Sequence, residues 1–172
     1  DFTMEVERSL RVLDGTIALF SAVEGVEPQS ETVWKQAERY GVPRIAFVNK
    51  MDRIGANFER VCDSIRERLH PKPVPVQLPM GAEAEFHGVI ELIGMRALVW
   101  GGETQMGAEF EERPIPADFE AVAVEAREAL IDAVSTVDDT ILELFLEGQG
   151  IPDERLWAAT RTATLNSSIV PV

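Results

Sequence analysis

The sequence has few of the residues that build disulfide frameworks, metal sites or membrane spans. Its 172 residues include one cysteine and two histidines. One cysteine excludes an internal disulfide and favours a reducing compartment, and His70 and His87 are too isolated to predict a metal site. No apolar run approaches the roughly 20 residues of a membrane span, and no charged-then-apolar leader is present. We therefore expect a soluble, cytoplasmic protein.

Basic residues are scarce in the second part of the chain. The net charge is −14, and residues 101–172 carry 15 acidic side chains against four basic ones. An acidic surface repels phosphate backbones, so we expect no non-specific binding of RNA or DNA and no membrane association. Two interpretations of the charge remain open, namely a basic protein partner and a solvated face that keeps the protein soluble.

Asn49-Lys50-Met51-Asp52 directly follows the apolar run 44–48, which is typical of a buried strand. Open α/β sheets place ligands at the carboxyl ends of such strands. An ionised carboxylate has two acceptor oxygens and no donor, so Asp52 can take two N–H donors from one edge of guanine. Asn49 can donate and accept at once, and the stem of Lys50 can lie along a flat ring. The pattern predicts a guanine-binding loop.

Helical patterns alternate with apolar strands over the first 70 residues. We predict helices at 3–13, 29–40 and 58–69, and buried strands at 16–22 and 44–48. Short connections between alternating elements favour a parallel sheet. Cys62 lies on the apolar stripe of the third helix, so we expect a core residue and not a nucleophile.

The pattern changes after Pro71. Closely spaced strands without helices predict a small antiparallel or mixed sheet, followed by a loop and three helices. The predicted strands span 74–80, 86–92 and 96–100, the loop spans 101–112, and the helices span 117–135, 138–147 and 152–164. Prolines at 73, 75 and 79 make the first strand an edge or irregular strand. The final run 168–172 is expected to rejoin the first sheet. The chain starts without methionine inside a helical pattern, and we expect a fragment of a longer protein.

The runs GVEPQSETVW (25–34) and VPRIAFVNKMDR (42–53) closely resemble the GTPase domain of the bacterial elongation factor G family. Residues 1–15 resemble its switch II helix. VQLPMG (76–81) and GVIEL (88–92) resemble the insert that interrupts that domain. The similarity covers essentially the whole chain in one order, and simpler translational GTPases lack this large insert.

This resemblance implies the fold and the domain organisation. The expected class is α/β, with a partial P-loop NTPase-type parallel sheet and an inserted α+β subdomain. Residues 1–70 and 166–172 would form a partial GTPase domain, and residues 71–165 the inserted subdomain. Loss of the strand that carries the phosphate loop would leave an exposed sheet edge, which invites pairing with another chain.

The resemblance also implies the activity of the parent protein, which hydrolyses GTP on the ribosome to drive tRNA and mRNA translocation. Asn49, Lys50 and Asp52 match its guanine-recognition motif for GTP and GDP. The sequence has no G-x-x-x-x-G-K-[ST] phosphate loop, so it lacks the lysine for the phosphates and the hydroxyl for Mg²⁺. We therefore assign no catalytic residue and no metal ligand to this chain, and expect it to be inactive alone.

The predicted partners are the ribosome and the C-terminal domain of its stalk protein. The family's first insert helix is implicated in that contact, which would place Glu125, Glu128 and Asp132 on the binding face; a merely solvated face is the alternative. Two further interpretations of the chain stay open. One is a fragment of a release-factor or ribosome-protection paralogue, and the other is an insert that acts only as a stalk-binding module.

Overall fold

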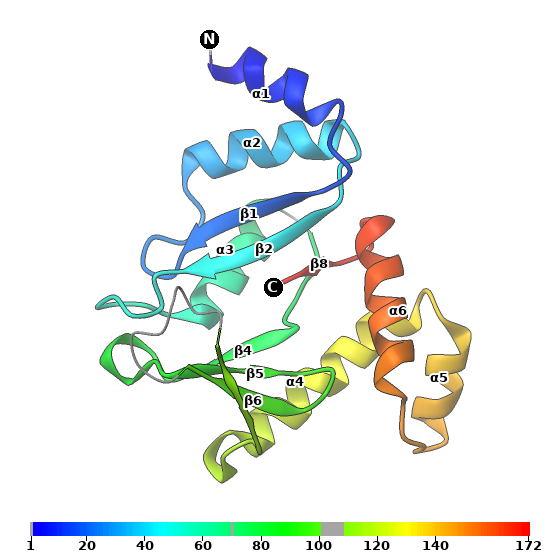
Figure 1. The fold of residues 1–172 in the computed structure, drawn as a ribbon. Helices are drawn as coiled ribbons and strands as arrows, with labels where there is room; N and C mark the ends of the chain where they lie inside the picture. Colours follow the sequence, from blue (N-terminus) through cyan, green and yellow to red (C-terminus); the bar gives the residue numbers. More distant parts are fainter. Residues whose placement is uncertain (1, 70, 101–108) are drawn as a thin grey trace.

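The computed structural model describes residues 2–69, 71–100 and 109–172, and its first part is a pair of parallel strands with helices (Figure 1). The elements are α1 (Phe2–Leu10), β1 (Thr16–Ser21), α2 (Pro28–Arg39), β2 (Arg44–Asn49) and α3 (Phe58–Leu69). β1 and β2 run in register from the pair Thr16–Arg44 to the pair Ser21–Asn49. Each element lies within a few residues of its predicted bounds, and the α/β class is confirmed.

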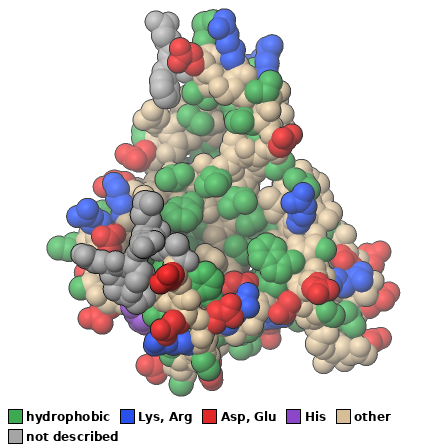
Figure 2. Space-filling model, viewed as in Figure 1, with side chains coloured by type: hydrophobic (Ala, Val, Ile, Leu, Met, Phe, Trp, Pro, Cys, Tyr) green, Lys and Arg blue, Asp and Glu red, His purple; other side chains and the backbone are tan. Residues whose placement is uncertain are grey.

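One face of the β1–β2 pair is covered and the other is open. Phe20 and Ala46 point into a core with Trp34 of α2 and with Val61 and Ile65 of α3. The alternate side chains are between 45% and 65% exposed, namely Ile17, Leu19, Ile45 and Phe47. The prediction of buried strands is therefore wrong for every second residue, because the core that buries these strands is formed with α2 and α3 on one face. Figure 2 shows hydrophobic side chains gathered over the region where Figure 1 places these strands.

An antiparallel sheet follows, in the order β4 (Gln77–Met80), β5 (Gly88–Glu91), β6 (Arg96–Val99) and β7 (Glu111–Arg113). The predicted strand 74–80 is split into β3 (Pro73–Val74) and β4, with Pro75 in the break; proline has no N–H to donate to a ladder. β7 lies inside a segment predicted as a loop. Its residues are all charged and exposed, so no apolar pattern marked it as an edge strand. Residues 101–108 of that predicted loop lie outside the described residues.

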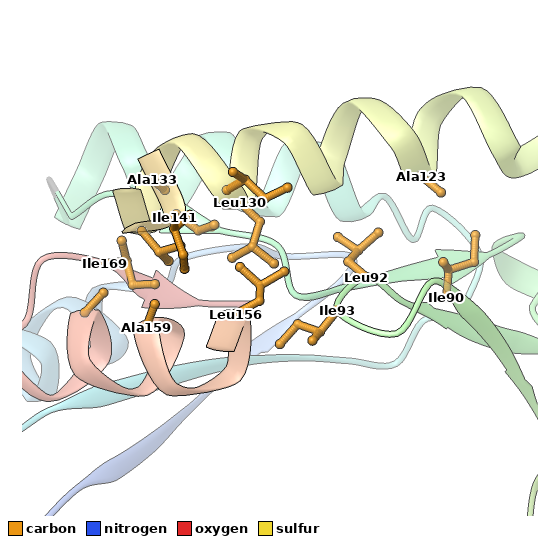
Figure 3. Packing of buried hydrophobic residues seen from close by; sticks show 14 of the residues in the cluster. Ile90, Leu92, Ile93, Ala123, Leu130, Ala133, Ile141, Leu156, Ala159 and Ile169 are labelled. Atoms are coloured by element: carbon orange, nitrogen blue, oxygen red, sulfur yellow. The ribbon is translucent and has the colours of Figure 1, made fainter. Parts of the chain in front are cut away.

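Three helices close the core of this second part: α4 (Ala117–Ser135), α5 (Asp139–Leu146) and α6 (Asp153–Leu165). Leu130 of α4, Ile141 of α5 and Leu156 of α6 are fully buried and meet Leu92 and Ile93, which follow β5 (Figure 3). The α4 prediction matches in both bounds. Val122 of this helix is exposed, while Ile131 and Val134 lie inside.

The last strand, β8 (Val170–Pro171), returns the chain to the first part. Its hydrogen-bonded partner is β3, in parallel, with Val170 N donating to Lys72 O at 2.9 Å. The expectation that residues 168–172 join the first sheet is corrected in this respect. Val170 and Val172 nevertheless pack in the core that contains Phe20. Among the described residues, no helix combines the length and apolarity needed to cross a bilayer.

Candidate functional site

The candidate site is the loop that follows β2, at the carboxyl ends of the two parallel strands. Ala22, just after β1, donates its N–H to Asn49 O at 2.8 Å and accepts from Asn57 N at 2.9 Å. These bonds tie both ends of the 49–57 loop to the end of β1. The sheet thus places the loop at the edge where α/β proteins hold ligands.

The three predicted base-binding residues lie together on this loop, and all three are exposed. The side-chain Oδ1 of Asn49 accepts from Lys50 N at 2.9 Å. Lys50 has a φ of 65°, in the left-handed region, and its carbonyl accepts from Arg53 N at 3.2 Å. Met51, by contrast, is 7% exposed and anchors the loop between the two polar ends. The burial of Met51 leaves its neighbours Lys50 and Asp52 facing outwards.

Asp52 is the acceptor that would read the base. Its side chain is 67% exposed, and its Oδ2 lies 3.8 Å from Nε of Arg53. An exposed pair of this kind contributes roughly 0–1 kcal/mol, so the carboxylate remains available to a ligand. Two acceptor oxygens on one exposed group match two adjacent N–H donors on a planar ring.

Two residues that support this loop were not predicted. The side chain of Asn57 accepts from Arg60 N at 2.8 Å and so caps α3; an Asn directly before an apolar helical pattern is the signal that could have found it. Nη2 of Arg60 donates to Val23 O at 2.6 Å and to Gly55 O at 2.9 Å. No sequence pattern indicates the role of Arg60, because its partners are backbone carbonyls that the fold brings near.

The predicted acidic face lies on α4. Glu125, Glu128 and Asp132 are all on the outer side of this helix, and Asp132 is 4.0 Å from Nζ of Lys72 with its side chain 77% exposed. Arg127 points the other way, donating to Leu92 O at 2.7 Å and to Ile93 O. The structure therefore separates an outward acidic face from an inward basic side chain on the same helix.

Cys62 and His87 have contacts that indicate structural roles. Burial raises the pKa of the Cys62 thiol to about 12, which agrees with the predicted core position. The ring Nδ1 of His87 lies 2.7 Å from Glu85 O, and His70 is outside the described residues. Within 2–69, 71–100 and 109–172, no three His, Cys, Asp or Glu side chains cluster as metal ligands.

Comparison with known proteins places this geometry in a family. A model of the family described as "Elongation factor Tu GTP binding domain" matches residues 1–166. A crystal structure of a protein from Thermus thermophilus is similar over 99% of this chain, with 27% identity and a TM-score of 0.83. The chain spans about a quarter of the length of that protein, since 25% of it is covered.

Proposed function

The chain belongs to the family of the elongation factor Tu GTP-binding domain, and we propose that it is the guanine-recognising part of a ribosome-dependent translational GTPase of the elongation factor G type. The observation that carries the proposal is the exposed cluster of Asn49, Lys50 and Asp52 at the end of a parallel strand. The large insert at 71–165 favours elongation factor G over simpler translational GTPases. The whole protein would use GTP hydrolysis in the cytoplasm to drive tRNA and mRNA translocation.

Recognition of the base rests on Asp52. Its carboxylate would accept the two adjacent N–H groups of guanine, a pair that adenine does not offer. The stem of Lys50 would lie along the ring with its ammonium in water. Asn49 would hold the loop through its bond to Lys50 N, while its side-chain NH₂ still carries donors.

Substitution of Asp52 in the full-length protein tests whether this carboxylate binds the base. Asp52→Asn replaces an acceptor by a donor, so GDP affinity should fall at least about tenfold, since each hydrogen bond to a charged group contributes about 1.5–3 kcal/mol. Xanthosine diphosphate, which has a carbonyl where guanine has its amino group, should gain affinity. Asp118→Asn, an exposed change in the first turn of α4, is the matched control. Equal GDP binding by both variants would exclude Asp52 as the base reader.

Hydrolysis depends on groups that this sequence does not contain. Transfer of a phosphoryl group is mainly a matter of positioning and charge stabilisation by a phosphate loop and Mg²⁺. We therefore expect the 172-residue chain alone neither to hydrolyse GTP nor to bind it tightly. A titration with fluorescent GDP that gave micromolar affinity would falsify this expectation.

A second proposal concerns the partner. The outward acidic face of α4, formed by Glu125, Glu128 and Asp132, would dock a basic surface of the ribosomal stalk protein's C-terminal domain. Charge reversal of all three should lower stalk-dependent turnover of the full-length protein and leave nucleotide affinity unchanged. A triple variant with Glu143→Lys, Glu147→Lys and Glu154→Lys, all exposed and outside α4, controls for the same change in net charge. Unchanged turnover in the triple variant would remove the stalk contact and leave a solvated face.

Two other assignments compete with elongation factor G. A release-factor or ribosome-protection GTPase would carry the same base-reading loop, and a stalk-binding module would carry only the acidic face. Translocation assays on the full-length protein separate them, because only a translocase moves tRNA and mRNA. The acidic surface also leads us to expect no non-specific nucleic acid binding by this segment.

A further inference from the structure

Glu83 of the insert is hydrogen-bonded to the base-reading loop, residues 49–57. This residue opens the short turn Glu83–Glu85 that follows β4. Its N–H donates to Met51 O at 2.8 Å, and its side-chain Oε1 accepts from Gly55 N at 2.7 Å. The two bonds bracket Asp52, one on the residue before it and one three residues after it. Both loops lie on the left of Figure 1.

The turn that carries Glu83 is well held. Glu83 has a φ of 57° and Gly81 a φ of 80°. A Cβ at Gly81 would lie 2.2 Å from Glu85 O, so only glycine permits this close turn. His87 N donates to Met80 O at 3.2 Å, and the fully buried Met80 anchors β4 in the core. The backbone of Glu83 is therefore held in place by the turn and by β4.

The same loop is held from its other side by the first part of the chain. The Gly55 carbonyl accepts from Arg60 at 2.9 Å, while the Gly55 N–H donates to Glu83. Within the part of the chain that the structure describes, the ion partner of the Asp52 carboxylate is the exposed Arg53. The position of Asp52 thus depends on the backbone of the loop, and that backbone depends on contacts at Met51 and Gly55.

We propose that Glu83 is a positioning residue of the base site, through which the insert sets the loop that carries Asp52. The proposal rests on guanine recognition by Asp52 as argued above. A hydrogen-bonding group selects its ligand well only when its supporting contacts hold it in place. Because energetic coupling between sites is reciprocal, base binding in turn stabilises the turn after β4.

Three variants test the role. Glu83→Ala removes the acceptor and keeps a Cβ at the same backbone conformation. Glu83→Gln keeps an oxygen that can accept from Gly55 N. Glu85→Ala changes a neighbouring exposed carboxylate of the same turn. Glu83 is itself exposed, so we expect all three variants to fold, as circular dichroism would verify.

Hydrogen exchange on the 172-residue chain measures the contact without any nucleotide. The Gly55 amide should exchange about tenfold faster in Glu83→Ala, a factor in the range of one lost hydrogen bond to a charged group. Glu83→Gln and Glu85→Ala should stay close to the wild type. Unchanged exchange in Glu83→Ala overturns the proposal, because the loop then does not depend on Glu83.

Nucleotide binding by the full-length protein tests the consequence. Glu83→Ala should weaken GDP by about three- to tenfold and inosine diphosphate less, because inosine lacks the amino group that Asp52 would bind. Glu83→Gln should restore the preference. Equal weakening of both nucleotides, or none, overturns the positioning role. Failure of the proposed function gives a different result: the wild type would then show no preference for GDP over inosine diphosphate. In that case Glu83 positions no base-binding residue, although hydrogen exchange still reports its contact with Gly55.

Discussion

The two parts of the molecule bury their apolar residues differently. In the second part, Leu130, Ile141 and Leu156 come from three helices and are fully buried against the segment after β5. In the first part, Leu19 and Phe47 are more than half exposed although they lie in equally apolar strands. Next to them, a groove of about 520 Å³ runs between the open sheet face and α6, lined by Ile17, Ile45 and Trp157 among others.

The difference shows that an apolar strand is buried only where a second layer covers it. The antiparallel sheet has α4 to close its core, and β1–β2 has α2 and α3 on one face. Contiguous exposed apolar surface of this kind commonly marks a contact site. The second part is thus the self-contained core of this chain, and the first part carries the exposed loop and the exposed face.

The largest expected loss of stability comes from a substitution in the better packed second part. Leu130→Ala should lower the free energy of unfolding by about 2–5 kcal/mol, because it removes buried methyl groups and leaves a cavity. Leu19→Ala, the same change on the open face, should cost less than about 1 kcal/mol. Urea denaturation of both variants checks the contrast. Equal losses would show that the open face is covered in solution.

A smaller effect compares the helix caps of the two parts. Asp138 caps α5, accepts from Thr140 N at 3.0 Å and pairs with Arg155 at 2.7 Å, whereas Asn57 caps α3. Substitution of either residue by Ala should lower the free energy of unfolding by about 0.5–2 kcal/mol. The bond from Arg155 holds the pKa of Asp138 below its usual value.

The cost at Asp138 should therefore depend on pH, while the cost at Asn57 should not. A depressed pKa in the folded state stabilises the fold above the unfolded value of about 3.9. That stabilisation is lost as pH falls through the lower folded pKa. Unfolding curves from about pH 7 down to about pH 2.5 should show the Asp138→Ala penalty shrinking with acid. A constant penalty would mean that the carboxylate charge has no part in the cap.

The smallest effect on stability concerns the open face and edge of β1–β2. An uncovered sheet edge beside apolar side chains favours pairing between copies of the chain. We expect concentration-dependent self-association in sedimentation velocity, and its loss in a Leu19→Lys, Phe47→Lys double variant with nearly unchanged stability. Val124→Lys, also exposed and apolar but on α4, should leave association unchanged. A wild type that stays monomeric at all concentrations would contradict the expectation.

Periodicity predicted most elements because each depends on nearby residues. The helix at 117–135 and the helix at 58–69 match in both bounds, since long apolar stripes identify helices well. β7 was missed because Glu111, Glu112 and Arg113 are all charged and exposed, so no apolar alternation marks the strand that pairs with β6. The split at Pro75 and the pairing of β8 with β3 depend on which strands become neighbours. Local sequence patterns do not contain that information.

The residues of the candidate site also fall into those that the sequence predicts and those that it does not. Asn49, Lys50 and Asp52 were predicted from a strand followed by a polar motif, and their common exposure fits that prediction; their binding role stays a prediction. Arg60 and Glu83 were not predicted, because each bonds a backbone group distant in sequence, Val23 O for Arg60 and Gly55 N for Glu83. Contacts between a side chain and a distant backbone leave no pattern in neighbouring residues.

The sequence by itself determined the α/β class, the order of most elements and the residues that could read a guanine base, because residue type and spacing decide these. Only the tertiary structure decided which face of β1–β2 is covered, where β8 pairs, and that Glu83 is hydrogen-bonded to the loop 49–57. Those features arise when segments distant in sequence pack together and satisfy one another's backbone groups.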